Sequence, residues 1–159
     1  MVQLRALLER CGAYSVIEAA FKSDELGQDF PVPLFEHIGI VYDRLEKVAD
    51  ASFPTIAPLR LAVLLHEQSP ASLPSLLVGA GFSDFAPIVL SVIGGFGELW
   101  KTKTEHEIAE YVLAHRDHLA SLLLFELAHE GRATGQMERA AELGSLDLSF
   151  KRWAARLPP

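Results

Sequence analysis

The chain has little cysteine and no long apolar run. Cys11 is the only cysteine among its 159 residues, so no disulfide can form within the chain. A chain of this kind suits a reducing compartment, and we expect a cytoplasmic protein. Charge, glycine or proline interrupts every apolar stretch well before the roughly 20 residues that cross a bilayer. The N-terminal residues also show no signal-peptide pattern, so we expect no membrane partner.

Basic residues are also scarce. The chain carries 14 Lys and Arg against 21 Asp and Glu, which gives a formal net charge of -7. Proteins that bind nucleic acids need clustered cations, and the only compact basic group is Lys151, Arg152 and Arg156. We therefore do not expect a nucleic-acid partner.

Strand-like alternation of apolar and polar residues is absent as well. Half of the residues are apolar, and they recur at spacings of three and four, which is the pattern of helices. Residues 4–21 predict a first helix and residues 34–48 a second. Residues 59–65 are apolar nearly all round, which predicts a central helix. We expect one all-α domain over residues 1–159, a helical bundle of about seven to nine helices.

Three polar sites predict helix starts. Thr104 with Glu107 forms a capping-box pattern that opens a helix ending near His115. Asp117 is placed to cap the next helix, and Ser83 and Asp84 to cap the helix that contains Val89.

Histidines and carboxylates at helix ends are the candidates for chemistry. His66 and Glu67 end the central helix, His37 borders the buried face of the second helix, and Glu130 ends another apolar helix. Two imidazoles and two carboxylates suit a borderline divalent ion. Structural explanations stay open: His66 could complement the dipole of its helix, and His129 could be the inward residue in place of Glu130.

A family resemblance rests on three groups of residues. They are Phe35-Glu36-His37 with Asp43-Arg44-Leu45, Leu59-Arg60-Leu61-Ala62 with Leu64-Leu65-His66, and residues 127–135. These segments resemble the HD superfamily of metal-dependent phosphohydrolases. They are most similar to the HD region that follows the catalytic head of tRNA nucleotidyltransferases and bacterial poly(A) polymerases. The resemblance covers residues 34–135 and implies an HD-like helical fold.

The resemblance also implies a metal site. His37 would be the first ligand and His66 the second, while Glu67 and Glu130 stand where the family has aspartates. The ion would be one divalent cation, such as Mn, Fe, Ni, Zn or Mg. The chain departs from the family in both glutamates, in Gln68-Ser69-Pro70 where Gly-Lys often follows the pair, and in having no histidine at 94–97. It also has no nucleotidyltransferase head.

Three functions therefore stay open. The first is a degenerate HD-like domain, with or without a metal, that is non-catalytic or weakly active. Such a domain would bind a nucleotide or phosphate, a protein partner, or a second copy of itself. The second is a divergent metal-dependent phosphohydrolase acting on a phosphate ester or nucleotide. The third is a tRNA-related accessory domain, which the acidic charge balance disfavours.

Overall fold

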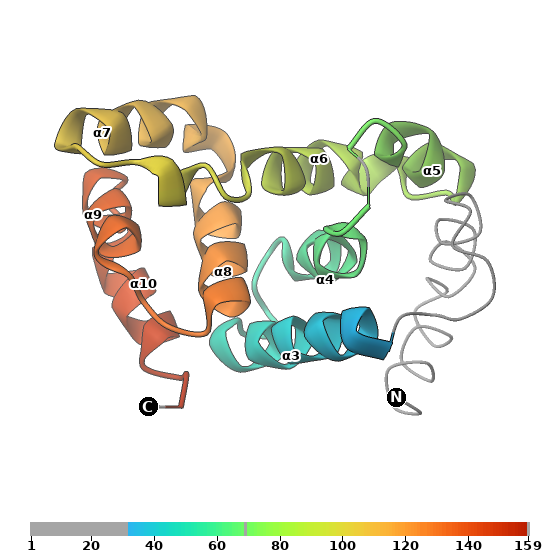
Figure 1. Ribbon diagram of the computed structural model, residues 1–159, viewed down its shortest axis with the longest axis horizontal. Helices are drawn as coiled ribbons and strands as arrows, with labels where there is room; N and C mark the ends of the chain where they lie inside the picture. Colours follow the sequence, from blue (N-terminus) through green and yellow to red (C-terminus); the bar gives the residue numbers. More distant parts are fainter. Residues whose placement is uncertain (1–31, 69, 159) are drawn as a thin grey trace.

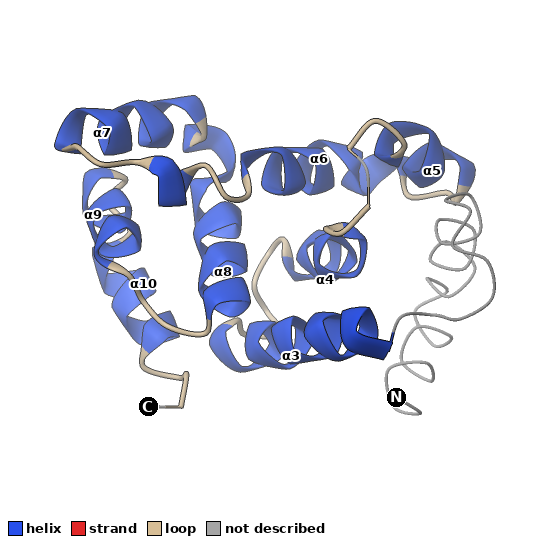
Figure 2. Ribbon diagram, in the orientation of Figure 1, coloured by secondary structure: helices blue, strands red, loops and turns tan. Residues whose placement is uncertain are grey.

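The chain folds into helices in the part that the structure describes. The computed structural model describes residues 32–68 and 70–158, and across these residues it contains eight α-helices and no strand (Figure 2). The expected all-α class and helix number are confirmed. The helix expected over residues 4–21 lies outside the described residues.

The helices follow one another through short connections (Figure 1). Three 3₁₀ turns lie between them, at Ser83–Phe85, Leu99–Lys101 and Arg116–His118. The α-helices are α3 (Val32–Val48), α4 (Ile56–Leu65), α5 (Leu73–Gly79), α6 (Ala86–Gly95), α7 (Glu105–Ala114), α8 (Leu119–Glu130), α9 (Gly135–Leu143) and α10 (Asp147–Ala154).

Helices α4 and α8 form the interior. Eight of the ten residues of α4 are buried, as its all-round apolar sequence predicts, and α4 lies between α3 and α6 (Figure 1). Nine of the twelve residues of α8 are buried, and this helix packs against α3, α6, α9 and α10. The C-terminal turns of α4 and α8 both face α3, which places residues distant in sequence side by side.

Only one of the three predicted caps forms. Thr104 accepts a hydrogen bond from the backbone N–H of Glu107, and the Glu107 carboxylate accepts one from the N–H of Thr104, which completes the capping box of α7. The predictions for Asp117 and for Ser83 and Asp84 are wrong. All three residues lie inside 3₁₀ turns that lead directly into α8 and α6, so none of them occupies the N-cap position.

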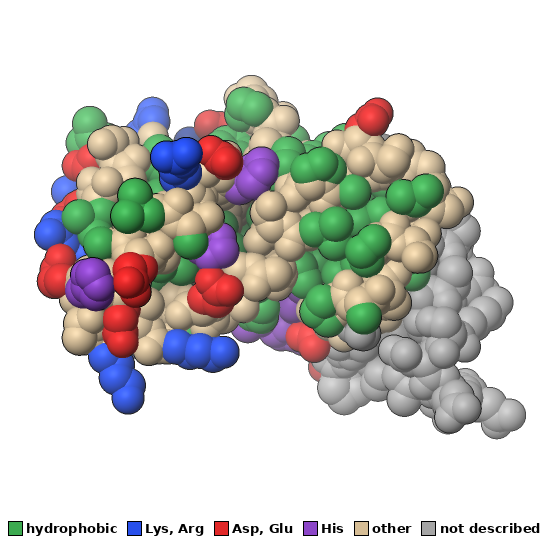
Figure 3. Space-filling view, turned by 90° about the horizontal axis from the view of Figure 1, so that it is seen from above, with side chains coloured by type: hydrophobic (Ala, Val, Ile, Leu, Met, Phe, Trp, Pro, Cys, Tyr) green, Lys and Arg blue, Asp and Glu red, His purple; other side chains and the backbone are tan. Residues whose placement is uncertain are grey.

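The surface differs between the two ends of the molecule. Viewed from the side of α5, α6 and α7, apolar side chains gather over the α5–α6 end and charged side chains over the α7 end (Figure 3). Val78 of α5 is 64% exposed. Among the described helices, none combines the length and apolar character needed to cross a membrane.

Candidate metal centre

Three histidines from different parts of the chain meet at one point. His37 lies in α3, His66 is the residue that ends α4, and His129 lies in the last turn of α8. One ring nitrogen of each lies within 4.8 Å of the other two. Within residues 32–68 and 70–158, no other group of three His, Cys, Asp or Glu side chains comes together in this way.

The ring of His66 has a fixed orientation and protonation. Its Nδ1 lies 2.6 Å from the backbone oxygen of Val63, and its side chain is fully buried. A carbonyl oxygen can only accept a hydrogen bond, so Nδ1 carries the proton and Nε2 keeps its lone pair. Fixing of the second ring nitrogen is typical of metal-ligating histidines. The unprotonated Nε2 of His66 is directed at the cluster.

The spacing of two of the ring nitrogens fits a shared ion. Nε2 of His37 and Nε2 of His66 are 3.2 Å apart. Two nitrogens at about 2.0–2.1 Å from one tetrahedral zinc ion would be separated by about 3.4 Å. The two imidazoles therefore have nearly the separation that joint ligation requires, without a change of rotamer.

Glu67 lies on the open side of the cluster. Its Oε1 is 3.2 Å from Nε2 of His66 and 3.5 Å from Nε2 of His37. The side chains of Glu67 and His37 are 41% and 37% exposed, whereas that of His66 is buried. The structure thus brings together three of the four residues predicted as ligands, with a carboxylate at the solvent-facing edge.

Glu130, the fourth predicted ligand, forms an ion pair with Arg132. Its Oε1 lies 3.3 Å from Nε of Arg132, and the group of three histidines does not include it. His129 takes that place, the alternative that the sequence leaves open. The spacing to Phe125 is the signal that favours it, because residues four apart on a helix share a face, and the apolar Phe125 predicts an inward face more strongly than Glu126, which is four residues before Glu130.

Two of the three histidines are held in their neutral form. Burial lowers the pKa of His66, and it lowers the pKa of His129 to about 4, with the nearby rings of His66 and His37 acting in the same direction. A metal ion binds neutral imidazole, so protons do not compete for these two ligands near neutral pH.

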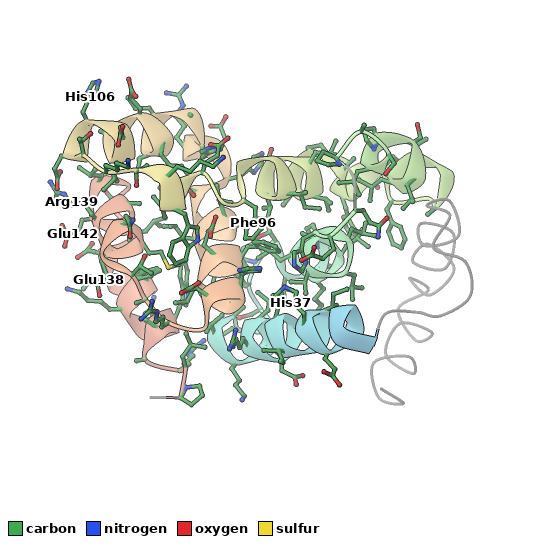
Figure 4. All side chains as sticks on the ribbon, in the orientation of Figure 1. His37, Phe96, His106, Glu138, Arg139 and Glu142 are labelled. Atoms are coloured by element: carbon green, nitrogen blue, oxygen red, sulfur yellow. The ribbon has the colours of Figure 1, made fainter. Side chains whose placement is uncertain are left out.

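Aromatic rings close the inner side of the site. Phe96 lies 4.5 Å from His129 and 5.9 Å from His66, measured between ring centroids, and Phe125 lies 5.5 Å from His66. Figure 4 labels Phe96 on the segment after α6 and His37 on α3, with both side chains directed into the interior. This apolar wall lowers the polarity on the inner side of the cluster and so strengthens electrostatic interactions there.

Comparison with known proteins gives no relative: no family model, curated protein or solved structure matches this chain. The chemistry of the site therefore follows from its own donors. Three imidazoles and one carboxylate are suited to hold a borderline transition-metal ion.

Proposed function

We propose that the protein binds one divalent transition-metal ion through His37, His66 and His129, with Glu67 as a fourth donor. The observation that carries this proposal is the convergence of three ring nitrogens within 4.8 Å. A set dominated by imidazole favours Zn, Ni, Cu or Fe over Mg, which prefers oxygen ligands. Of the ions that the sequence suggests, Mg fits the described donors least.

Metal analysis of the purified protein and calorimetric titration of the metal-free protein with Zn²⁺ and Ni²⁺ test the proposal. We expect one ion per chain, and loss of binding in His66→Ala. The control is His106→Ala, because the side chain of His106 is 82% exposed and its ion pair is with Glu110. A wild-type protein that takes up no ion, or a His66→Ala protein that binds as wild type does, would contradict the proposal.

Hydrolysis of a phosphate ester is the second candidate, and the position of Glu67 favours it. The carboxylate stands beside two ring nitrogens and is 41% exposed, so a substrate could reach it from solvent. A bound ion would lower the pKa of a coordinated water and polarise a phosphoryl oxygen. In this candidate Glu67 would leave the ion to the three histidines and accept the proton that the attacking water loses.

A screen with p-nitrophenyl phosphate and bis-p-nitrophenyl phosphate, with Zn, Ni or Mn added, tests this activity. Glu67→Gln keeps the length of the side chain and removes its basicity. We expect this variant to lose at least about 100-fold in rate while the histidines retain the ion. Metal binding with no turnover of either ester would leave a non-catalytic metal-binding module.

An HD-type ancestry is part of the same proposal. Support for it comes from the order of His37, His66 and Glu67 along the chain combined with their proximity in the fold. A histidine in place of the family's final aspartate would be a further departure from the HD pattern. The tRNA-related function gains no support from the described residues, and the chain is acidic.

A further inference from the structure

Helix α3 presents two functional groups to the C-terminal turn of α8. His37 and Arg44 are seven residues apart, close to two helical turns, so they lie on the same face of α3. The His37 ring lies 5.0 Å from the ring of His129. Nη1 of Arg44 donates to the backbone oxygen of His129 at 3.1 Å and, at 3.5 Å, to that of Ala128.

The guanidinium of Arg44 also packs closely against the residue that ends α8. Gly131 has a positive φ of 78°, the left-handed conformation that commonly terminates helices. A Cβ atom on Gly131 would lie 2.5 Å from Cζ of Arg44. Arg44 therefore holds the end of α8 at two carbonyl groups and one glycine, around the residue that carries the third imidazole.

We propose that Arg44 is a positioning residue of the metal centre, which sets the place of the His129 ring relative to His37 by holding the His129 backbone. This inference rests on the proposed metal-binding function. The last carbonyl groups of a helix have no partner inside the helix, and the last turn is the part that frays. A clamp on the carbonyl of His129 fixes this ligand to the helix that provides another.

A second arginine provides a matched control. Nη1 of Arg156 donates to the backbone oxygen of Val48 at 3.0 Å, at the last residue of α3, and pairs with Asp50. Arg44 and Arg156 thus both bind the carbonyl end of a helix. Val48 lies eleven residues beyond His37, about 16 Å along the helix, so Arg156 stabilises a helix end without touching the cluster.

The experiment compares Arg44→Ala, Arg44→Lys and Arg156→Ala in the full chain. The first measurement is the Kd for Zn²⁺ by calorimetry. We expect Arg44→Ala to weaken binding about 10-fold or more, as loss of an outer partner of a metal ligand does. Arg44→Lys, which keeps a donor and the charge, should recover part of the affinity. Arg156→Ala should bind Zn²⁺ as wild type does, even if its melting temperature falls by as much as that of Arg44→Ala.

The second measurement needs no metal. Ring ¹H–¹⁵N chemical shifts of the metal-free protein report the environment of each histidine. We expect Arg44→Ala to change the shifts of His129 and Arg156→Ala to leave them unchanged. If wild type binds no ion and the His129 shifts still move, the metal function fails while the positioning role stands. If Arg44→Ala binds Zn²⁺ like wild type and its His129 shifts stay, the positioning role is overturned and the metal function stands.

Discussion

Glu126 is the buried carboxylate of the interior. It is 0% exposed in the middle of α8, one turn before His129. Its Oε1 accepts a hydrogen bond of 2.9 Å from the N–H of Gly97, and the side chain of Trp100 is a second hydrogen-bond donor beside the carboxylate. Burial raises the pKa of Glu126 to about 7, so folding favours the protonated acid.

This pKa predicts a pH-dependent stability. An unfolded glutamate releases its proton near pH 4.5, whereas folded Glu126 keeps its proton up to about pH 7. The folded state binds more protons in that interval. The contribution of Glu126 to stability is therefore fully present below pH 4.5 and is lost as the pH rises through 7. Glu126→Gln removes this ionisation and keeps an oxygen for the N–H of Gly97.

When the pH is raised from 5 to 8, we expect the free energy of unfolding of Glu126→Gln to rise by about 2 to 3 kcal/mol relative to that of wild type. Urea unfolding of both proteins at the two pH values measures this change. Glu138→Gln is the control, since Glu138 is an exposed residue of α9. If the difference in free energy of unfolding between Glu126→Gln and wild type is the same at pH 5 and pH 8, the prediction is refuted.

Three of the residues that meet at the cluster could be predicted from the sequence. His37, His66 and Glu67 follow from their places at the borders and ends of apolar helices. His129 and Glu130 are neighbours that point about 100° apart, and the order of residues alone does not say which one faces inward. In the structure the ring of His129 lies 5.0 Å from that of His37 and 5.5 Å from that of His66, whereas Glu130 pairs with Arg132.

At the scale of the helix, α7 shows what a local signal can specify. Its capping box closes between Thr104 and Glu107, so two backbone N–H groups at the helix start find partners. Both partners lie within four residues of each other. Tertiary packing is not needed to form the motif, and for that reason the sequence predicts it correctly.

We expect Thr104→Ala to lower the free energy of unfolding by about 1 kcal/mol, the usual cost of losing an N-cap side chain. Asp117→Ala is the contrasting variant, because the Asp117 side chain is 85% exposed and accepts no cap bond in α8. It should change stability by less than about 0.5 kcal/mol. Equal losses in both variants, measured by chemical denaturation, would show that the capping box contributes nothing particular.

The failed caps have a structural cause. Arg116–His118 is a 3₁₀ turn in which the N–H of His118 already bonds the oxygen of His115 at 3.1 Å. The chain passes through this turn straight into α8, with His118 as N-cap. Whether a short connection becomes an open N-cap or a 3₁₀ turn depends on how the flanking helices pack, which sequence spacing does not encode.

At the scale of the whole molecule, the class of the fold was predictable and the pairing of helices was not. Apolar spacing specifies which residues are helical and which face is buried. The contact between Arg44 and the oxygen of His129 joins residues 85 positions apart. Such pairings depend on the shapes of whole helix surfaces, which apolar spacing along the chain does not encode.

Metal binding should stabilise the molecule as a whole, because the donors come from α3, the end of α4 and the end of α8. An ion at 100 times its Kd adds about 2.7 kcal/mol to the folded state. For a chain of this length, that corresponds to an increase in melting temperature of about 5 to 10 °C. Addition of EDTA should reverse the increase.

The increase in melting temperature should depend on the donors that join α3, α4 and α8, and on no other histidine. His37→Ala removes the donor of α3, so we expect its melting temperature to respond little to Zn²⁺. His106→Ala should respond as wild type does, because His106 lies exposed on α7. Thermal unfolding followed by circular dichroism, with and without Zn²⁺, makes the comparison. If all three proteins gain the same number of degrees, the ion acts away from this cluster, and the helices are not joined through it.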